Sequence, residues 1–134
     1  MALTEGEGLP IALSLHSARP HEVTLAFDLV QECVTEELPE RVIGDTAYDS
    51  DSLDAQFTEI DIEVIAPHRK NRKPENRTQD GRSLRRGKRR WKIERFFAHL
   101  QNFRRVIVRY EQHSRNYLGW LQMAATCILV RNYF

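Results

Sequence analysis

Short apolar runs and helical periodicities alternate along the first half of the chain. Apolar runs at residues 9–15, 41–45 and 62–67 are bounded by turn-forming residues and predict three short strands. Between them, apolar side chains recur at helical spacing in residues 20–37 and 50–60, which predicts two helices. Strand–helix–strand alternation of this kind predicts an α/β sheet with parallel neighbouring strands.

The second half of the chain has a different pattern. Residues 68–88 are polar and basic and show no periodicity, so we expect a mobile loop there. From 89 to 111 apolar side chains recur about every 3.6 residues, which predicts one long amphipathic helix. A second carboxyl-terminal helix is predicted over residues 115–130. No apolar stretch reaches the roughly 18 residues of a membrane helix, so we expect no membrane association.

The composition fits a single domain of 134 residues. Hydrophobic residues make up 41% of the chain, which is enough for a compact core. The first residues are acidic and lack the basic and apolar segments of a signal peptide. Cys33 and Cys127 stand in apolar surroundings without metal-ligand spacing, and we interpret them as reduced core residues. We therefore expect a cytoplasmic protein.

Charge is distributed unevenly between the two halves. Residues 1–67 contain 15 acidic side chains and 2 arginines, whereas residues 68–115 contain 17 lysines or arginines and 4 acids. Such a separation indicates a polyanionic partner for the basic half, with a solvated basic face as the ordinary alternative. Trp91, Tyr110 and Tyr117 are candidates for base stacking, although core packing is the more usual role. The cations expected to contact DNA are Arg69, Lys70, Arg72, Lys73, Arg90, Arg95, Arg104, Arg105 and Arg109.

Two carboxylates are candidates for metal binding. Asp45 ends the second predicted strand, where ligands collect in open α/β sheets; alternatively it starts a turn or caps a helix. Asp49 and Asp51 follow it, and we expect both to be more exposed and to act as capping residues. Glu94 borders the apolar stripe of the long helix, where we expect it to be half-buried and either paired with Arg90 or bound to a metal ion. If the two carboxylates converge, they could hold magnesium or manganese ions that activate water and stabilise the leaving oxygen in phosphodiester cleavage. The histidines show no HxxH or HExxH spacing, so a zinc site is not expected.

Longer stretches of the sequence resemble a known family. The stretches are "RVIGDTAYDSDSLDA", "IAPHRKNRK" and "WKIERFFAHLQNFRRVIVRYEQHSRNYLGWLQMAATCILV". In this order they resemble the carboxyl-terminal part of bacterial insertion-sequence transposases of the DDE type, and the resemblance covers residues 7–129. It implies a truncated RNase H-like fold, with a mixed sheet, flanking helices and two carboxyl-terminal helices. It also implies Mg²⁺ and the cleavage and transfer of DNA strands at transposon ends.

The resemblance assigns roles to the two carboxylates. Asp45 matches the second catalytic acid of the family, and Glu94 matches the third. The signature around the glutamate is a tyrosine, two residues, an arginine, three residues, the glutamate, six residues and a lysine. Arg90 and Glu94 fit this signature, whereas Gly87 and Gln101 replace the tyrosine and the lysine. The change at Gln101 removes a side chain that would contact the DNA backbone.

One part of the family pattern has no counterpart in this chain. The first catalytic aspartate belongs on a strand upstream of residue 9, and none of the first eight residues is an aspartate. We expect that strand, and most of the next one, to be absent. The chain is therefore interpreted as residues 1–134 of a partial transposase catalytic domain that is inactive alone and depends on an upstream transposase fragment or a second copy. We expect this fragment to be associated with the bacterial nucleoid. The alternatives are a non-catalytic DNA-binding remnant that regulates a full-length transposase, and an unfolded relic.

Overall fold

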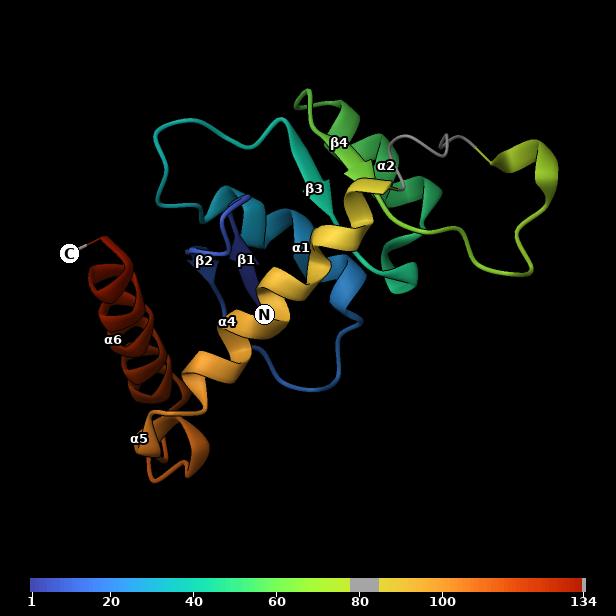
Figure 1. Cartoon of the computed structure of the whole chain (residues 1–134). Coiled ribbons are helices and arrows are strands. Elements are labelled where there is room, and N and C mark those ends of the chain that lie inside the picture. The colour runs from blue at the N-terminus through green and yellow to red at the C-terminus, as the bar shows by residue number, and fades with distance from the viewer. Residues whose placement is uncertain (78–84, 134) are drawn as a thin grey trace.

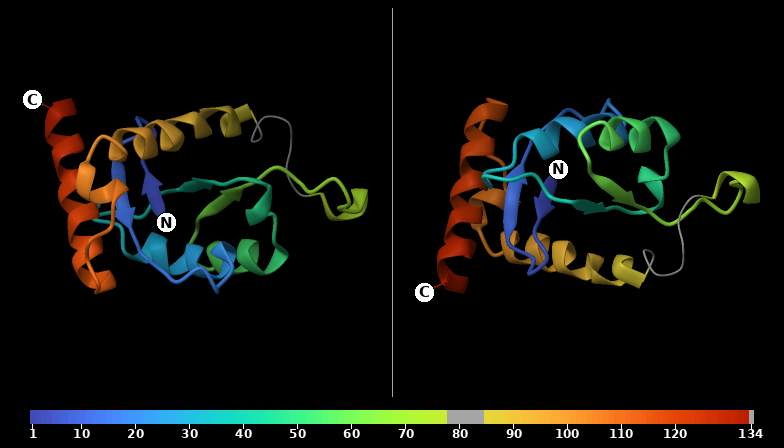
Figure 2. Two further views of the ribbon diagram at one scale, coloured as in Figure 1. Left: turned by 90° about the horizontal axis from the view of Figure 1, so that it is seen from below. Right: turned by 90° about the horizontal axis from the view of Figure 1, so that it is seen from above.

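The computed structural model describes residues 1–77 and 85–133, and it arranges them in three layers (Figure 1). Helices α1 (Glu22–Gln31) and α2 (Asp51–Thr58) cover one face of the strands, and α4 (Trp91–Leu100) covers the other. Figure 2 shows the strands between these two helical layers, with α6 (Ser114–Tyr133) at one end of the molecule. The chain is thus a mixed α/β protein, as the pattern of apolar residues predicted.

The chain begins with an antiparallel hairpin. Strands β1 (Ala2–Thr4) and β2 (Pro10–Leu13) pair through Leu3 and Ala12, and Gly8 has a φ of 90° in the connecting turn. The ammonium group of Met1 donates a hydrogen bond to the Ser14 carbonyl, which extends the pairing by one residue. β2 lies inside the strand predicted over residues 9–15. β1 was not predicted, because three residues are too few to show a pattern before they pair; its shortness agrees with the expectation that little strand precedes residue 9.

The second pair of strands is parallel. Strands β3 (Arg41–Ile43) and β4 (Glu63–Ile65) are connected through α2, and Val42 lies opposite Val64. Parallel strands need a crossover connection, which the predicted helix supplies, so the prediction of parallel neighbours is confirmed for this pair. Asp61, between α2 and β4, has a φ of 57°, a left-handed conformation that aspartate tolerates better than most residues.

The two strand pairs form separate sheets rather than one. Within the described residues the strand order is β1–β2 in one sheet and β3–β4 in the other. One core cluster contains Val30, Phe57 and Val64 and lies under β3 and β4. The other lies between α4 and α6 and contains Phe96 and Ile128. The expected mixed sheet is therefore divided in the middle, and this division creates the cavity described below.

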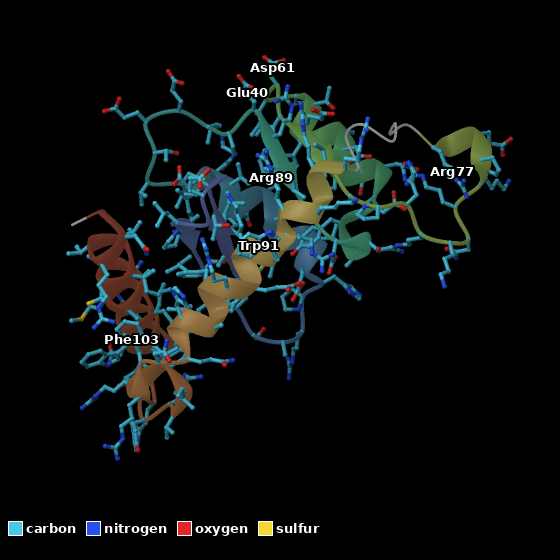
Figure 3. The ribbon with its side chains drawn as sticks, viewed as in Figure 1. Glu40, Asp61, Arg77, Arg89, Trp91 and Phe103 are labelled. Atoms are coloured by element: carbon cyan, nitrogen blue, oxygen red, sulfur yellow. The ribbon has the colours of Figure 1, made fainter. Side chains whose placement is uncertain are left out.

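The prediction of one long helix over residues 89–111 is wrong for the second half of this range. The helical segment begins with the 3₁₀ turn η3 (Gly87–Arg90), continues as α4 and stops at Leu100; only the short helix α5 (Arg104–Ile107) follows. Phe103 lies at this junction with an extended ψ of 110° and packs against the core between α4 and α6 (Figure 3). The β-branched run from Val106 to Val108 also disfavours helix, since such side chains lose rotamer freedom there.

Two further expectations are corrected near the helix ends. α1 stops at Gln31 instead of continuing to residue 37, and the Val34 amide donates to the Ile11 carbonyl of β2 at 2.9 Å. Cys127 is exposed and Cys33 is only partly buried, so the interpretation of both as core residues is wrong. No helix in the described part of the chain is long and apolar enough to cross a membrane.

The basic segment expected as a mobile loop, residues 68–88, falls partly outside the described residues, which omit 78–84. In the described part, the 3₁₀ turn η2 (Pro74–Asn76) and η3 interrupt it. Its first residues, from His68 to Arg72, are held against the body of the protein by side-chain contacts.

Candidate functional site

Asp45 lies two residues beyond the end of β3, on the loop that leads into the 3₁₀ turn η1 (Thr46–Tyr48). Its carboxylate oxygen Oδ1 accepts a hydrogen bond of 2.8 Å from the Ala47 amide, so Asp45 caps this turn. The side chain is partly exposed. Because a carboxylate can accept several bonds on its two oxygens, capping the turn leaves acceptor capacity for a cation.

The turn after Asp45 folds tightly against β3. A Cβ atom added to Gly44 would lie 2.9 Å from the ring of Tyr48, closer than atoms pack without displacement. The Tyr48 hydroxyl donates a 3.4 Å hydrogen bond to Glu22 of α1. Burial, and then the nearby charges of Glu22 and Asp45, raise the pKa of Tyr48 to about 12. Glycine is therefore required beside Asp45 to let the tyrosine cover the strand end.

Glu94 lies in the first turn of α4. Its side chain is 67% exposed, which corrects the expectation of half-burial. Arg90 lies one turn earlier, and its guanidinium is 3.7 Å from the Glu94 carboxylate. An exposed helical pair with four-residue spacing contributes about 0.3–0.5 kcal/mol, so this contact holds Glu94 only weakly.

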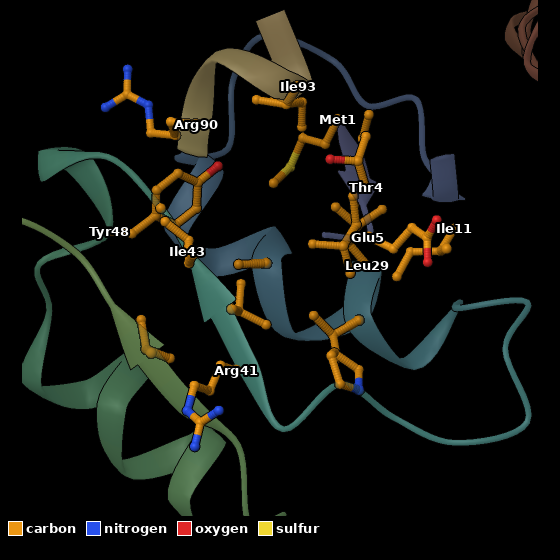
Figure 4. Close-up of a pocket in the computed structure, with 18 of the residues that line it drawn as sticks. Met1, Thr4, Glu5, Ile11, Leu29, Arg41, Ile43, Tyr48, Arg90 and Ile93 are labelled. Atoms are coloured by element: carbon orange, nitrogen blue, oxygen red, sulfur yellow. The ribbon is translucent and has the colours of Figure 1, made fainter. Parts of the chain in front are cut away.

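Asp45 and Glu94 line the same cavity although 48 residues separate them in the sequence. The cavity has a volume of about 610 Å³, and its walls come from β1, α1, β3 and α4 (Figure 4). Arg89, Arg90 and Lys92 also line it, from the segment that carries Glu94. The structure thus brings both predicted acids to one cavity with a cationic side.

A third carboxylate, Asp49, has a different role from the one predicted. Its side chain is 2% exposed and accepts hydrogen bonds from His68 Nδ1 at 2.9 Å, the Arg69 amide at 2.8 Å and the Arg72 guanidinium at 2.7 Å. Burial alone would raise the pKa of Asp49, but these bonds and the charge of Arg72 lower it below its usual value. The prediction of an exposed capping residue is wrong for Asp49; Asp51 is exposed and pairs with Arg72.

Several cations predicted to contact DNA are engaged within the protein. Arg69 donates from its guanidinium to the carbonyls of Thr46 and Ala47, at 3.3 and 3.1 Å. Together with Arg72 it fastens the basic segment to the turn that follows Asp45. Lys70 and Lys73 are exposed, and Lys73 lies 3.7 Å from Glu75. Arg77, Arg85 and Arg86 of the same segment are exposed as well.

The cations that follow η3 lie beside aromatic rings. Arg95 lies over Trp91, Arg105 over Trp120 and Arg109 over Tyr117, with 4.6–5.4 Å between the guanidinium carbon and the ring centre. Arg105 also pairs with Glu111 at 3.2 Å, whereas Arg104 is exposed on α5. Trp91 and Tyr110 are more than half exposed, at 51% and 64%, so ordinary core packing does not account for them. Tyr117 is half-buried and donates from its hydroxyl to the Val106 carbonyl.

Comparison with known proteins shows where this arrangement belongs. The sequence profile described as "Transposase DDE domain" matches residues 1–129. The chain belongs to the DDE transposase family. It is also similar to a "Putative transposase for insertion sequence element IS402" from Burkholderia cepacia, with 28% identity over 138 aligned residues. The match covers 97% of this chain but 61% of that relative, and no solved structure matches the chain.

DDE transposases generally use a divalent metal, which requires suitable donor atoms in the cavity. Asp45 and Glu94 are oxygen donors, the type that magnesium and manganese prefer. Among the described residues, however, no three histidines, cysteines or carboxylates lie close enough together to hold an ion. The described part of this transposase chain therefore supplies two suitable donors and an incomplete ligand set.

The Asp49 cluster is the feature that inspection of the sequence missed. Asp49, His68 and Arg72 are 19 and 4 residues apart in order, a spacing with no local periodicity. One signal was present. Charged residues follow directly after the predicted strand of residues 62–67. If this strand is parallel to the strand of residues 41–45, both end at the same edge, where a partner for a buried Asp49 would lie. In this transposase chain the cluster fixes the loop that presents Asp45.

Proposed function

We propose that this chain is part of an RNase H-like catalytic domain that contributes two of three metal-binding carboxylates to DNA strand cleavage and transfer. Asp45 and Glu94 are the second and third acids, and Mg²⁺ or Mn²⁺ is the cofactor. DNA at transposon ends and at the target is the substrate, which places the chain at the bacterial nucleoid in the cytoplasm. We expect little strand transfer from the 134 residues alone, because the first acid is not among them.

The observation that carries this proposal is the shared cavity of Asp45 and Glu94. One carboxylate follows a strand and the other stands on a distant helix, and nothing in the local sequence requires them to meet. The cations on the same wall, Arg89, Arg90 and Lys92, suit a phosphate backbone. A divalent metal bound there would neutralise the developing charge on the phosphate and activate water.

The chain's own residues have defined tasks in this proposal. Asp45 is held by the Ala47 amide and by a turn that Arg69 and Asp49 fasten in place, so its position is set by backbone contacts. Glu94 is held loosely and pairs with Arg90. A cation bound between the carboxylates would replace Arg90 as the partner of Glu94, which frees this arginine for a phosphate oxygen.

Metal binding tests the proposal directly. We expect Mn²⁺, followed by electron paramagnetic resonance, to bind the chain at least about tenfold more weakly after Asp45→Asn or Glu94→Gln, because loss of even an outer partner of a metal site costs about 10–100-fold. Asp28→Asn and Glu59→Gln change exposed acids outside the cavity and should leave the Mn²⁺ affinity unchanged. Equal Mn²⁺ affinity of the wild-type chain and all four variants would remove the metal site from the proposal.

A second function is a non-catalytic DNA-binding protein that regulates a full-length transposase. The ion pair between Arg90 and Glu94 favours it, since a carboxylate with a cationic partner needs no metal. In that case DNA binding would be independent of Mg²⁺ and unaffected by Glu94→Gln. The catalytic proposal instead requires that Mg²⁺ strengthen DNA binding in the wild-type chain and do so less in the Glu94→Gln variant.

A further inference from the structure

The basic segment begins with a tight turn that has two faces. The Arg72 amide donates a 3.0 Å hydrogen bond to the Arg69 carbonyl, which closes a β-turn over residues 69–72. Lys70 and Asn71 are at its tip and are exposed. The side chains of Arg69 and Arg72 instead reach back to the body of the protein. This 69–72 turn therefore has one face toward the protein and one toward solvent.

The inner face of the 69–72 turn is bonded to η1, the 3₁₀ turn that follows Asp45. The Arg69 guanidinium donates to the carbonyls of Thr46 and Ala47, at 3.3 and 3.1 Å. The Thr46 carbonyl belongs to the same peptide group as the Ala47 amide, and that amide donates to Asp45 Oδ1 at 2.8 Å. A single peptide group therefore links the Arg69 guanidinium to the Asp45 carboxylate, and hydrogen bonds in such a chain polarise and strengthen one another.

A second set of contacts fixes where the 69–72 turn lies. Asp49 Oδ2 accepts from the Arg69 amide at 2.8 Å, and Asp49 Oδ1 accepts from the Arg72 guanidinium at 2.7 Å. The Asp49 side chain is 2% exposed, so water competes little for these bonds. Arg69 as a whole is exposed, so its bonds to η1 are weaker than those to Asp49. The base of the turn is thus firmly held, whereas its link to Asp45 can still be strengthened.

The outer face of the 69–72 turn presents cations to solvent. Lys70 is exposed at the tip, and Lys73 follows directly after the turn. Lys73 lies 3.7 Å from Glu75, but both side chains are more than 70% exposed, and such a surface pair contributes little. Both lysines can therefore donate to phosphate oxygens, contacts that fix the register of a protein on DNA. Lys70 is adjacent to Arg69, so DNA bound at the tip also restricts the motion of Arg69.

We propose that the 69–72 turn couples DNA binding to the metal site. Phosphate contacts at Lys70 and Lys73 order the turn, and Arg69 acts as a positioning residue that transmits this order to Asp45 through η1. This inference rests on the proposed function, which supplies the DNA partner and the role of Asp45 as a ligand. A carboxylate that is held in place before the metal arrives binds it more tightly, because less freedom is lost on binding.

The coupling has a reciprocal consequence. If DNA raises the affinity of the Asp45 site for metal by some factor, metal raises the affinity for DNA by the same factor. The metal is then bound most tightly when a DNA strand lies beside the 69–72 turn. The chain without DNA holds its metal more weakly, which limits metal-dependent cleavage to sites where DNA contacts this turn.

Hydrogen exchange at the Ala47 amide tests the coupling without any metal. This amide donates to Asp45 Oδ1, so its exchange rate reports how firmly the carboxylate is held. The full chain is followed by nuclear magnetic resonance with and without a non-specific DNA duplex, at a concentration that saturates binding in fluorescence anisotropy. We expect DNA to slow exchange at Ala47 by about fivefold or more, the lower end of typical coupling between sites.

A pair of charge-conserving variants separates positioning from simple attraction to DNA. Arg69→Lys keeps the positive charge but loses the planar fork that reaches two carbonyls. Arg77→Lys is the matched control, since Arg77 is an exposed arginine on the projecting part of the same segment (Figure 3). DNA affinity should be similar in both variants and the wild type, and so should the midpoint of urea denaturation. Only Arg69→Lys should lose most of the DNA-induced slowing at Ala47.

Metal affinity in the absence of DNA gives a second readout. We expect Arg69→Lys to weaken Mn²⁺ binding, followed by electron paramagnetic resonance, by roughly tenfold, the lower end of the effect of outer partners of a metal site. Arg77→Lys should bind Mn²⁺ as the wild type does. A change in Mn²⁺ affinity at an unchanged urea midpoint identifies positioning, because a general loss of stability would change both.

Two results would overturn the proposal: no slowing at Ala47 in the wild type at saturating DNA, or equal slowing in the wild type and Arg69→Lys. Either result would leave the metal site standing, provided that Mn²⁺ binding still depends on Asp45 and Glu94. Conversely, Arg69-dependent slowing at Ala47 in a chain without carboxylate-dependent Mn²⁺ binding would support the link from DNA to Asp45 and remove the proposed chemistry.

Discussion

Individual polar side chains determine how the loop beside the candidate site is held. Asp49 is almost fully buried, yet it stays ionised because His68, Arg72 and the Arg69 amide all bond to it. Burial of a carboxylate without such partners is strongly unfavourable. The sequence predicted an exposed Asp49, because nothing local shows which acid folding will bury.

Removing the charge of Asp49 should therefore destabilise the protein. We expect Asp49→Asn to lower the free energy of unfolding by about 3 kcal/mol, the lower end of the cost of breaking a buried pair from one side. Urea denaturation measures this change. Asp51→Asn is the matched control, because Asp51 also pairs with Arg72 but is exposed, and it should cost less than about 1 kcal/mol. Equal losses in the two variants would contradict the assigned role of Asp49.

The same residue predicts a pH dependence. The folded protein lowers the pKa of Asp49, so its stabilising contribution is complete above the unfolded-state pKa of about 3.9. This contribution is lost as the pH falls below that value through the lower pKa of the folded state. In urea denaturation across this range, the stability of the Asp49→Asn variant should fall less steeply than that of the wild type. A parallel decline in both proteins would show that Asp49 does not titrate in this way.

Gly44 offers a second test of local packing. A methyl group there would lie 2.9 Å from the Tyr48 ring, so Gly44→Ala should cost about 1–3 kcal/mol in the free energy of unfolding. The Cβ atom of Tyr48 lies at the same 2.9 Å, so the control is Tyr48→Gly, which removes both this atom and the ring. In that background the same Gly44→Ala change should cost much less. The coupling energy from this double-mutant cycle is the measurement, and additive costs would exclude the clash.

Among the secondary-structure elements, the break after α4 best shows where local periodicity fails. Apolar side chains continue at helical spacing through Ile107 and Tyr110, which predicts a helix over the whole stretch. In the structure Phe103 packs into the core between α4 and α6, and the chain turns there. Tertiary packing of one aromatic ring thus outweighs a weak local preference for helix.

The two phenylalanines of α4 should differ in their effect on stability. Phe96 is 2% exposed and packs against α6, whereas Phe97 is 44% exposed at the cavity. We expect Phe96→Ala to lower the free energy of unfolding by about 3–5 kcal/mol in chemical denaturation. Phe97→Ala should cost less in the isolated chain, because nearly half of its surface remains exposed there. Similar costs at both positions would mean that the cavity is closed in solution.

The molecule as a whole combines an acidic half, which holds the strands, with a basic half, which holds α4 and α5. Several arginines of the basic half are occupied by internal contacts, so its affinity for DNA should depend on fewer cations than its composition indicates. The sequence does not show which arginines make internal contacts, because every arginine contributes the same charge to its composition. Exposed cations such as Arg104 are the better candidates for phosphate contacts.

Salt dependence measures how many cations contact DNA. For a non-specific duplex, each phosphate contact adds about 0.9 to the magnitude of the slope of log affinity against log salt. Arg104→Gln should reduce that slope by about one contact. Arg19→Gln, which changes an exposed arginine in the acidic half, should leave the slope unchanged. A fluorescence anisotropy titration at several salt concentrations gives both slopes, and identical slopes would exclude Arg104 from the interface.

Local patterns in the chain were sufficient to locate the elements β2, β3, α2, β4 and α6. They also predicted the parallel pairing of β3 with β4, pointed to the two acids of the cavity and indicated the family. These features are encoded within short windows, in turn residues, in periodicity and in an ordered motif. Folding alone decided that Asp49 is buried, that the helix breaks at Phe103, and that β1 pairs with β2 while an open space separates β1 from β3. These outcomes depend on which distant side chains and backbone groups meet, and no short window contains that information.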